Sequence, residues 1–233
     1  MNMPFYVSPE QVMQDKAEYA RKGVSRGKSS VTLEFQDGVV LMAENTSSLS
    51  KIGEIYDRIA FAGVGKFSEF DQLRKIGVRY ADTKGYSYSR EDVRGKALAN
   101  AYSQAIGDVF TREMKPLEVE VIVAEVGETS LAGHERNAIY RIQFDGSISD
   151  HQGYCVIGGA ADDLNEMLRG DYRADMSLGD ALQLGRRALQ RASDGQPQVS
   201  PENLEVCVLD RNRPGRKFTR LSTDELRESL GSD

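Results

Sequence analysis

The amino-acid sequence predicts an α+β protein in which two antiparallel sheets are enclosed between layers of helices. Three observations support this fold class. Strand-like runs fill residues 29–63, two long helical patterns follow without a strand between them, and a second block of strands begins near residue 117. Helices that do not alternate with strands argue against a doubly wound parallel sheet. A four-layer α-β-β-α sandwich covers every amphipathic face, and because no internal repeat or low-complexity segment is visible we expect one domain.

The chain is organised around a hairpin predicted near its N-terminal end. Apolar and polar residues alternate over residues 31–35, which is the pattern of a half-buried strand. Asp37-Gly38 then predicts a tight turn, because such turns favour a glycine with positive φ. Residues 39–43 are apolar throughout, so the second strand should be covered on both faces. A second antiparallel pair is predicted at residues 51–52 and 55–63.

A helix is predicted before this hairpin. Ser8 can cap it, Pro9 suits its first position, and Gln11 is placed to close a capping box. The helix should run to about Lys22, with Gly23 at its C-terminal cap. Its apolar stripe is thin for a core helix, so we expect it to lie on the surface or on a neighbouring subunit.

The remaining elements follow from hydrophobic periodicity and from turn and capping residues. A polar stretch at residues 82–89 should separate two helices, and Ser177 and Ser222 each precede an acidic residue by three positions, which marks a helix start. The predicted helices cover residues 67–80, 91–112 and 160–169, with two more after Ser177 and Ser222. The predicted strands cover residues 117–126, 138–144, 147–149, 153–157, 204–209 and 217–221.

Composition excludes several classes of function. The 233 residues carry a net charge of −6, which argues against a nucleic-acid-binding surface. No apolar run approaches the ~20 residues that span a membrane, and the N-terminal residues lack the basic and apolar regions of a signal peptide. Cys155 and Cys207 lie in apolar runs and should be buried thiols, not a disulfide. These features favour a cytoplasmic protein without a membrane or nucleic-acid partner.

Several segments, taken together, resemble a known family. They are S-P-E-Q with Y-A-R-K-G-V, the block from Lys51 to Lys66, A-D-T-K-G-Y-S-Y, L-A-N-A-Y-S-Q, E-V-E-V-I-V-A-E-V, Y-R-I-Q-F-D-G-S-I and L-E-V-C-V-L-D-R-N-R-P. From Ser8 to about Leu230 this pattern is similar to the α subunits of bacterial, actinobacterial-type 20S proteasomes. The resemblance implies the N-terminal-nucleophile hydrolase fold of the proteasome type. It also implies a gate segment and an α-type helix in residues 1–28, and the sandwich domain in residues 29–233.

The resemblance implies a function and partners as well. In this family seven α subunits form a ring that caps a ring of β subunits, in an α7β7β7α7 particle, and narrows the entry to the proteolytic chamber. The α ring receives the C-terminal tails of a ring-shaped ATPase. Its substrates are unfolded proteins, in this lineage often pupylated, that is, marked with a small ubiquitin-like modifier. We therefore expect these partners and no cofactor.

Catalysis in this family belongs to the β subunits, which use an N-terminal threonine as nucleophile and its own α-amine as base. Aligning Asp37 and Glu44 with the β pattern puts Lys28 at the nucleophile position, inside the chain and behind a helix. No catalytic residue is therefore expected. The alternative is an active N-terminal-nucleophile hydrolase, formed if cleavage near Ser29 or Ser30 exposes a serine.

The resemblance also implies two functional regions, an activator-tail pocket and a gate. Lys51 matches a lysine that lines a pocket between neighbouring α subunits and pairs with the C-terminal carboxylate of an activator tail, a role that suits a mobile ammonium group. Gly27, Gly65 and Lys66 match segments that border this pocket. Without the resemblance, Lys51 and Glu44 would be interpreted as an ion pair or as surface charges. The gate is assigned to Met1, Asn2, Met3, Pro4, Phe5, Tyr6, Val7, Ser8 and Pro9.

Other features have a structural interpretation. Residues 158–160, Gly-Gly-Ala, have the form of a phosphate cradle, but Asp162 and Asp163 in the following turn favour a plain helix start. His134 and His151 lack the spacing of metal ligands, so no metal site is expected. Tyr86 and Tyr88 should pack against a neighbour, and the basic residues Arg211, Arg213, Arg216, Lys217 and Arg220 should form a solvated or interface face.

Overall fold

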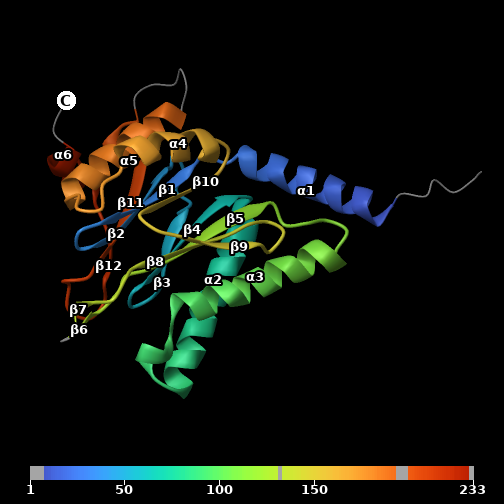
Figure 1. Cartoon of the computed structure of the whole chain (residues 1–233), viewed down its shortest axis with the longest axis horizontal. Coiled ribbons are helices and arrows are strands. Elements are labelled where there is room, and N and C mark those ends of the chain that lie inside the picture. Colours follow the sequence, from blue (N-terminus) through green and yellow to red (C-terminus); the bar gives the residue numbers. More distant parts are fainter. Residues whose placement is uncertain (1–7, 131–132, 193–198, 231–233) are drawn as a thin grey trace, which may run out of the picture.

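The computed structural model describes residues 8–130, 133–192 and 199–230, and in them the predicted α-β-β-α sandwich is confirmed (Figure 1). Each of its two main sheets has five strands, and all the paired strands are antiparallel. The first sheet has the order β10 (Tyr154–Ile157), β1 (Ser30–Phe35), β2 (Gly38–Glu44), β11 (Leu204–Asp210) and β12 (Phe218–Arg220).

The second sheet is built from the other predicted strand pair and the later strands. Its order is β3 (Ile52–Tyr56), β4 (Ile59–Gly65), β5 (Val119–Glu125), β8 (Ala138–Ile142) and β9 (Ile148–His151). A separate short ribbon pairs β6 (Thr129–Ser130) with β7 (Gly133–His134).

The hairpin of β1 and β2 is confirmed, but the reason given for its glycine is wrong. Phe35 pairs with Gly38 across the turn, and the glycines with positive φ do not include Gly38. A Cβ on Gly38 would instead lie 1.9 Å from the carbonyl oxygen of Leu209 on β11. Glycine is therefore required by the close approach of a neighbouring strand. All of β2 is buried, as its apolar run predicts.

Helices cover the outer face of each sheet. The first sheet carries α4 (Ala161–Asp171), α5 (Leu178–Ala192) and α6 (Thr223–Leu230), and the second carries α2 (Phe67–Ser87) and α3 (Gly95–Arg112). Short 3-10 turns precede α3 and β11, at η1 (Arg90–Asp92) and η2 (Pro201–Asn203). One apolar core lies between the two sheets, and one lies between each sheet and its helices. Cys155 and Cys207 are free thiols buried between the sheets, as predicted.

Helix α1 (Pro9–Ser25) projects from one end of the sandwich, alongside the end of α3 (Figure 1). The Ser8 side chain accepts a hydrogen bond from the Gln11 N–H at 3.2 Å, which confirms Ser8 as the cap, whereas the Gln11 side-chain amide donates to Asp15 at 2.7 Å. The prediction that Gly23 forms the C-terminal cap is wrong, because the helix continues to Ser25. Only Ala20 and Val24 are buried in it, which agrees with the thin apolar stripe.

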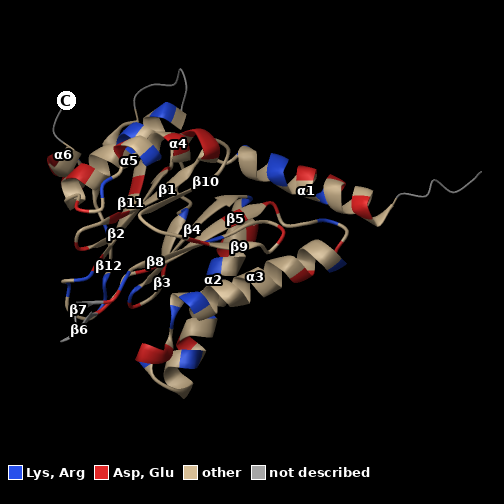
Figure 2. Cartoon of the chain, viewed as in Figure 1, with Lys and Arg blue, Asp and Glu red and all other residues tan. Residues whose placement is uncertain are grey.

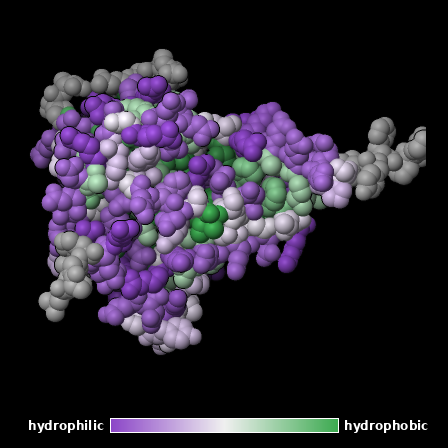
Figure 3. Space-filling model, viewed as in Figure 1, coloured by the Kyte–Doolittle hydropathy of each residue, from purple (hydrophilic) through white to green (hydrophobic). Residues whose placement is uncertain are grey.

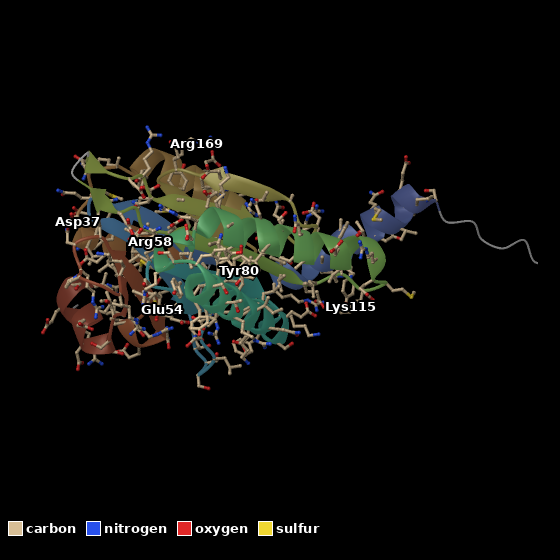
Figure 4. All side chains as sticks on the ribbon, turned by 90° about the horizontal axis from the view of Figure 1, so that it is seen from below. Asp37, Glu54, Arg58, Tyr80, Lys115 and Arg169 are labelled. Atoms are coloured by element: carbon tan, nitrogen blue, oxygen red, sulfur yellow. The ribbon has the colours of Figure 1, made fainter. Side chains whose placement is uncertain are left out.

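A small contact cluster fixes α1 to the sandwich. Ala20 packs with Phe110 of α3 and with Phe144, and the Lys16 ammonium donates to the Phe110 carbonyl oxygen at 3.1 Å. Lys115 lies beside this end of the molecule, opposite to the end that carries Asp37 and Arg58 (Figure 4). The outer surface of α1 remains exposed, so a neighbour can cover it.

The predicted polar break at residues 82–89 is wrong for most of its length, because α2 continues to Ser87. Two glycines let this helix pack closely. A Cβ on Gly85 would lie 2.2 Å from the Tyr56 hydroxyl oxygen, and one on Gly77 would lie 1.8 Å from that of Tyr102. Helix α3 starts at Gly95 and not at Glu91, because Glu91 and Asp92 belong to η1 and the next two residues are extended. Among the described residues, no helix is both long and apolar enough to cross a membrane.

The Gly77 contact gives a test of this packing. Gly77→Ala should lower the free energy of unfolding by about 1–3 kcal/mol, because the new methyl group overlaps the Tyr102 hydroxyl. In a Tyr102→Phe background the loss should be smaller. Gly170→Ala on α4 is the control, since a Cβ there meets nothing within 4 Å, and it should stabilise the protein by about 0.4–1 kcal/mol. Urea unfolding measures the stability of Gly77→Ala, of Gly77→Ala in the Tyr102→Phe background, and of Gly170→Ala. If Gly77→Ala lowers the free energy of unfolding equally with and without the Tyr102 hydroxyl, the contact is contradicted.

Candidate functional site

A cavity of about 510 Å³ opens where the C-terminal end of α1 meets the start of β1, the end of β2, and helices α4 and α5. Figure 3 shows hydrophobic surface in this part of the molecule, between α4 and α1. Two cationic residues and one carboxylate are among the residues that line the cavity, so its charged lining is net positive. The lining residues are Ser25, Arg26, Gly27, Lys28, Ser29, Glu44, Gly159, Ala160, Leu189 and Ala192.

Lys51, the central residue of the predicted pocket, adjoins this cavity. Its ammonium donates to the main-chain carbonyl oxygens of Glu44 at 3.0 Å and of Lys28 at 3.2 Å, and both residues line the cavity. These bonds use two of the three N–H donors of a lysine ammonium group. Burial lowers the pKa of Lys51, whereas the carboxylates of Glu205 and Glu44 raise it and Lys28 lowers it further.

A buried carboxylate that sequence reasoning missed holds the main chain at Lys51. Glu205 on β11 accepts hydrogen bonds from the Lys51 N–H at 2.9 Å and from the Ile52 N–H at 3.1 Å, and it pairs with Arg220. Glu205 is 8% exposed. An acidic residue inside the apolar run L-E-V-C-V-L was the available signal, because a buried charge needs partners.

Gly27 and Gly65, two other predicted pocket residues, lie side by side. A Cβ on Gly27 would come within 2.9 Å of the Gly65 nitrogen and 2.6 Å of the Val64 side chain. Gly65 has φ +108°, and a Cβ there would lie 1.9 Å from the Glu118 carbonyl oxygen. Both positions therefore need glycine if the end of α1 is to rest on the end of β4.

Lys66 follows Gly65 in the chain, but its side chain has a different partner. Its ammonium pairs with Glu69 of α2 at 3.2 Å, and its main-chain N–H donates to the Glu118 carbonyl oxygen at 2.9 Å. The structure therefore gathers Lys51, Gly27 and Gly65 around one end of the sandwich. It places the Lys66 side chain beside the start of α2.

Lys28, the residue that the sequence pattern aligns with the nucleophile of β subunits, is held in an ion pair. The Lys28 ammonium contacts the Glu44 carboxylate. Ser29 and Ser30 are both buried; the Ser29 hydroxyl accepts from the Ala160 N–H at 3.4 Å, and the Ser30 hydroxyl donates to the Met42 carbonyl oxygen at 3.1 Å. The main chain before them continues into α1. Residue 28 therefore has a peptide bond where N-terminal-nucleophile chemistry requires a free amine.

The other candidate features serve the fold. The N–H groups of Gly158 and Ala160 donate to Glu120 and Ser29, so these two amides of the glycine loop already have partners within the protein. Of the predicted basic face, Arg213, Arg216 and Arg220 line one further cavity, where Arg216 pairs with Glu54 and Arg220 with Glu205. Elsewhere Lys and Arg are interspersed with Asp and Glu (Figure 2). In the parts of the chain that the structure describes, no three His, Cys, Asp or Glu residues form a metal-binding group.

The gate residues Met1–Val7 lie outside the described residues. Ser8 and Pro9 are described, as the cap and the first residue of α1. The last two predicted gate residues therefore lie at the start of α1.

Comparison with known proteins identifies the family. Residues 24–209 match the family model of proteasome subunits. The chain is 50% identical to the proteasome subunit alpha of Geodermatophilus obscurus, over 99% of this chain and 82% of that protein. It is 51% identical to the proteasome subunit alpha of Kineococcus radiotolerans over 95% of each chain, and 48% identical to that of Thermobifida fusca over 99% of this chain and 91% of that protein. The chain therefore belongs to the proteasome subunit family, and within it to the bacterial α type.

Proposed function

We propose that the chain is a non-catalytic subunit of the α ring of a cytoplasmic bacterial 20S proteasome. In this role a ring of seven copies caps the β ring and controls the entry of unfolded, pupylated substrates. Its pockets dock the C-terminal tails of a ring ATPase. The observation that supports docking best is the Lys51 ammonium, which is fixed by two carbonyls that belong to residues lining the cavity.

The geometry suits the capture of a carboxylate. After its two main-chain hydrogen bonds, the Lys51 ammonium keeps one N–H donor for an incoming group. Partial burial strengthens a charge-assisted hydrogen bond, because water competes less with it. The glycine contact between Gly27 and Gly65 keeps the end of α1 close to β4 without a side chain in between. A tail that ends in a free carboxylate can therefore meet a cation held in a fixed position.

The lack of catalysis follows from the connection between α1 and β1. Helix α1 ends at Ser25 and β1 begins at Ser30, and the Gly27 N–H donates to the Val24 carbonyl oxygen at 2.9 Å. This hydrogen bond ties the residues before the nucleophile position to the helix. It supports the proposed division into a gate segment and helix, residues 1–28, and a sandwich domain, residues 29–233.

Two features support a gate in the N-terminal residues. The Ser8 cap fixes where α1 begins, and Pro4 to Val7 are too apolar for a purely solvated tail. Val12, Met13 and Tyr19 are 38–50% exposed on α1, which offers apolar contacts to a neighbouring copy in a ring. Tails that start from such helices would meet on the ring axis and block it.

The first prediction from the proposed function concerns catalysis. The purified chain without β subunits should not hydrolyse fluorogenic peptides, because position 28 has no free α-amine. Ser29→Ala is the matched control for the alternative of cleavage near Ser29, and it should leave the absence of activity unchanged. Turnover that disappears in Ser29→Ala, together with an intact mass that starts at Ser29, would establish the hydrolase instead.

The second prediction concerns Lys51. Lys51→Ala should abolish ATPase-dependent protein degradation and leave the β peptidase sites intact. Losing a charge-assisted contact removes on the order of 1.5–3 kcal/mol per tail, and several tails on one ring multiply the effect. Because burial lowers the pKa of Lys51, docking should weaken as the pH rises and the ammonium loses its proton.

Lys75→Ala is the control for this experiment. Lys75 forms an ion pair with Asp71 on the surface of α2 and does not line the cavity. ATPase-dependent degradation should stay at the wild-type level in this variant. If Lys51→Ala also leaves stimulation by the ATPase unchanged, Lys51 does not bind the tail.

The third prediction concerns the gate. Deleting residues 1–7 retains the Ser8 cap and should raise the hydrolysis of small peptides by the assembled α/β particle in the absence of an activator. The rate should rise without a change in cleavage preference, since the β sites are untouched. A truncated particle that assembles normally and cleaves peptides at the wild-type rate would show that this segment is not the gate.

A further inference from the structure

We propose that Lys28 is a second binding residue for the incoming carboxylate, and that Glu44 occupies it until a tail docks. The inference deepens the proposed tail-docking function and rests on it. Lys28 and Glu44 form an ion pair beside Lys51, and both line the cavity. The free subunit thus holds a carboxylate of its own on a cation that an external carboxylate can reach.

The three charged residues are linked through the main chain. The Lys51 ammonium donates to the carbonyl oxygens of Lys28 and of Glu44, the two residues whose side chains pair with each other. Lys28 and Glu44 also act on the pKa of Lys51 in opposite directions, which places all three charges within electrostatic reach. A ligand carboxylate at Lys51 therefore lies close to the Lys28–Glu44 pair.

The two members of the pair differ in exposure. The Lys28 side chain is 44% exposed and the Glu44 side chain 11%. A lysine with this exposure sits on a long, flexible stem and can turn towards a ligand, whereas the carboxylate is held in the wall. An ion pair with a half-exposed partner is also weak, because water screens it. Moving the Lys28 ammonium from Glu44 to a ligand is therefore not strongly opposed.

The stoichiometry of hydrogen bonds gives Lys28 a role that Lys51 cannot fill alone. A terminal carboxylate has two oxygens, whereas Lys51 has one N–H donor beyond its two carbonyl bonds. A second cation can satisfy the second oxygen. The charges of Lys28, Glu44 and Lys51 sum to +1, so the group attracts an anion. Glu44 makes this attraction weaker than two lysines alone would.

The test measures peptide affinity on the assembled α/β particle. The probe is a fluorescent peptide with the C-terminal sequence of the cognate ring ATPase, with a free carboxylate or as its C-terminal amide. Lys28→Met should weaken binding of the carboxylate form about three- to tenfold, the range expected for a partly screened charge contact. Glu44→Gln should tighten it about threefold, since it frees Lys28 while keeping the size of the side chain. The amide form should respond to neither change.

The double variant separates direct contact from net charge. Lys28→Met with Glu44→Gln restores a net charge of +1 on the three residues. If Lys28 contacts the carboxylate, the double variant still binds more weakly than the wild type. Binding at the wild-type level would show that only net charge matters, and it would overturn the proposal. Lys28→Arg should retain most of the affinity, because it keeps the charge.

Two further comparisons complete the design. Lys75→Met, at an ion-paired lysine on the surface of α2, should bind the peptide as the wild type does. If Lys51→Ala leaves the affinity unchanged, the proposed docking function fails. If Lys51→Ala loses binding while Lys28→Met has no effect, only the role of Lys28 fails.

Discussion

The position of Lys51 depends on one buried carboxylate that joins the two sheets. Glu205 belongs to β11 of the first sheet and accepts hydrogen bonds from the main chain at Lys51 and Ile52, at the start of β3 in the second. A carboxylate with this burial is stable only while its partners remain, since an unpaired buried charge is costly. The same interaction that connects the layers of the fold therefore also places the cation at the cavity.

Local patterns in the sequence predict the elements well, and two of the errors have tertiary causes. The Asp37-Gly38 turn is where it was predicted, yet Gly38 is required by the backbone of Leu209 on a strand more than 160 residues away in sequence. Helix α2 passes through the predicted break because Gly85 packs against Tyr56. A glycine in a polar stretch thus has two interpretations, a turn or a close contact, and only the position of a distant residue decides between them.

In the candidate site, too, some features were predicted from the sequence and others depend on distant residues. Lys51, Gly27 and Gly65 were found through the resemblance to proteasome α subunits, and the structure brings them to one end of the sandwich. The support from Glu205 was not predicted, because it acts across 154 residues of sequence on the Lys51 N–H. Lys28 and Glu44 were identified from the sequence only as positions that align with β subunits, and their pairing was not predicted. That they share a cavity follows from the antiparallel pairing of β1 and β2, which returns the end of β2 to the start of β1.

The connection from α1 into β1 explains how one fold can support two different functions. In an N-terminal-nucleophile enzyme, the start of the first strand must carry a free amine. Here α1 leads into β1 through Gly27, so Lys28, which the sequence pattern aligns with the nucleophile of β subunits, has a peptide bond on its nitrogen and pairs with Glu44. The cavity beside this connection is lined by the cations Arg26 and Lys28. A site that can no longer attack a carbonyl can still bind a carboxylate, because anion binding needs only charge and donors in fixed positions. On the proposed function, tail docking therefore needs the charged groups at this connection and no free terminus.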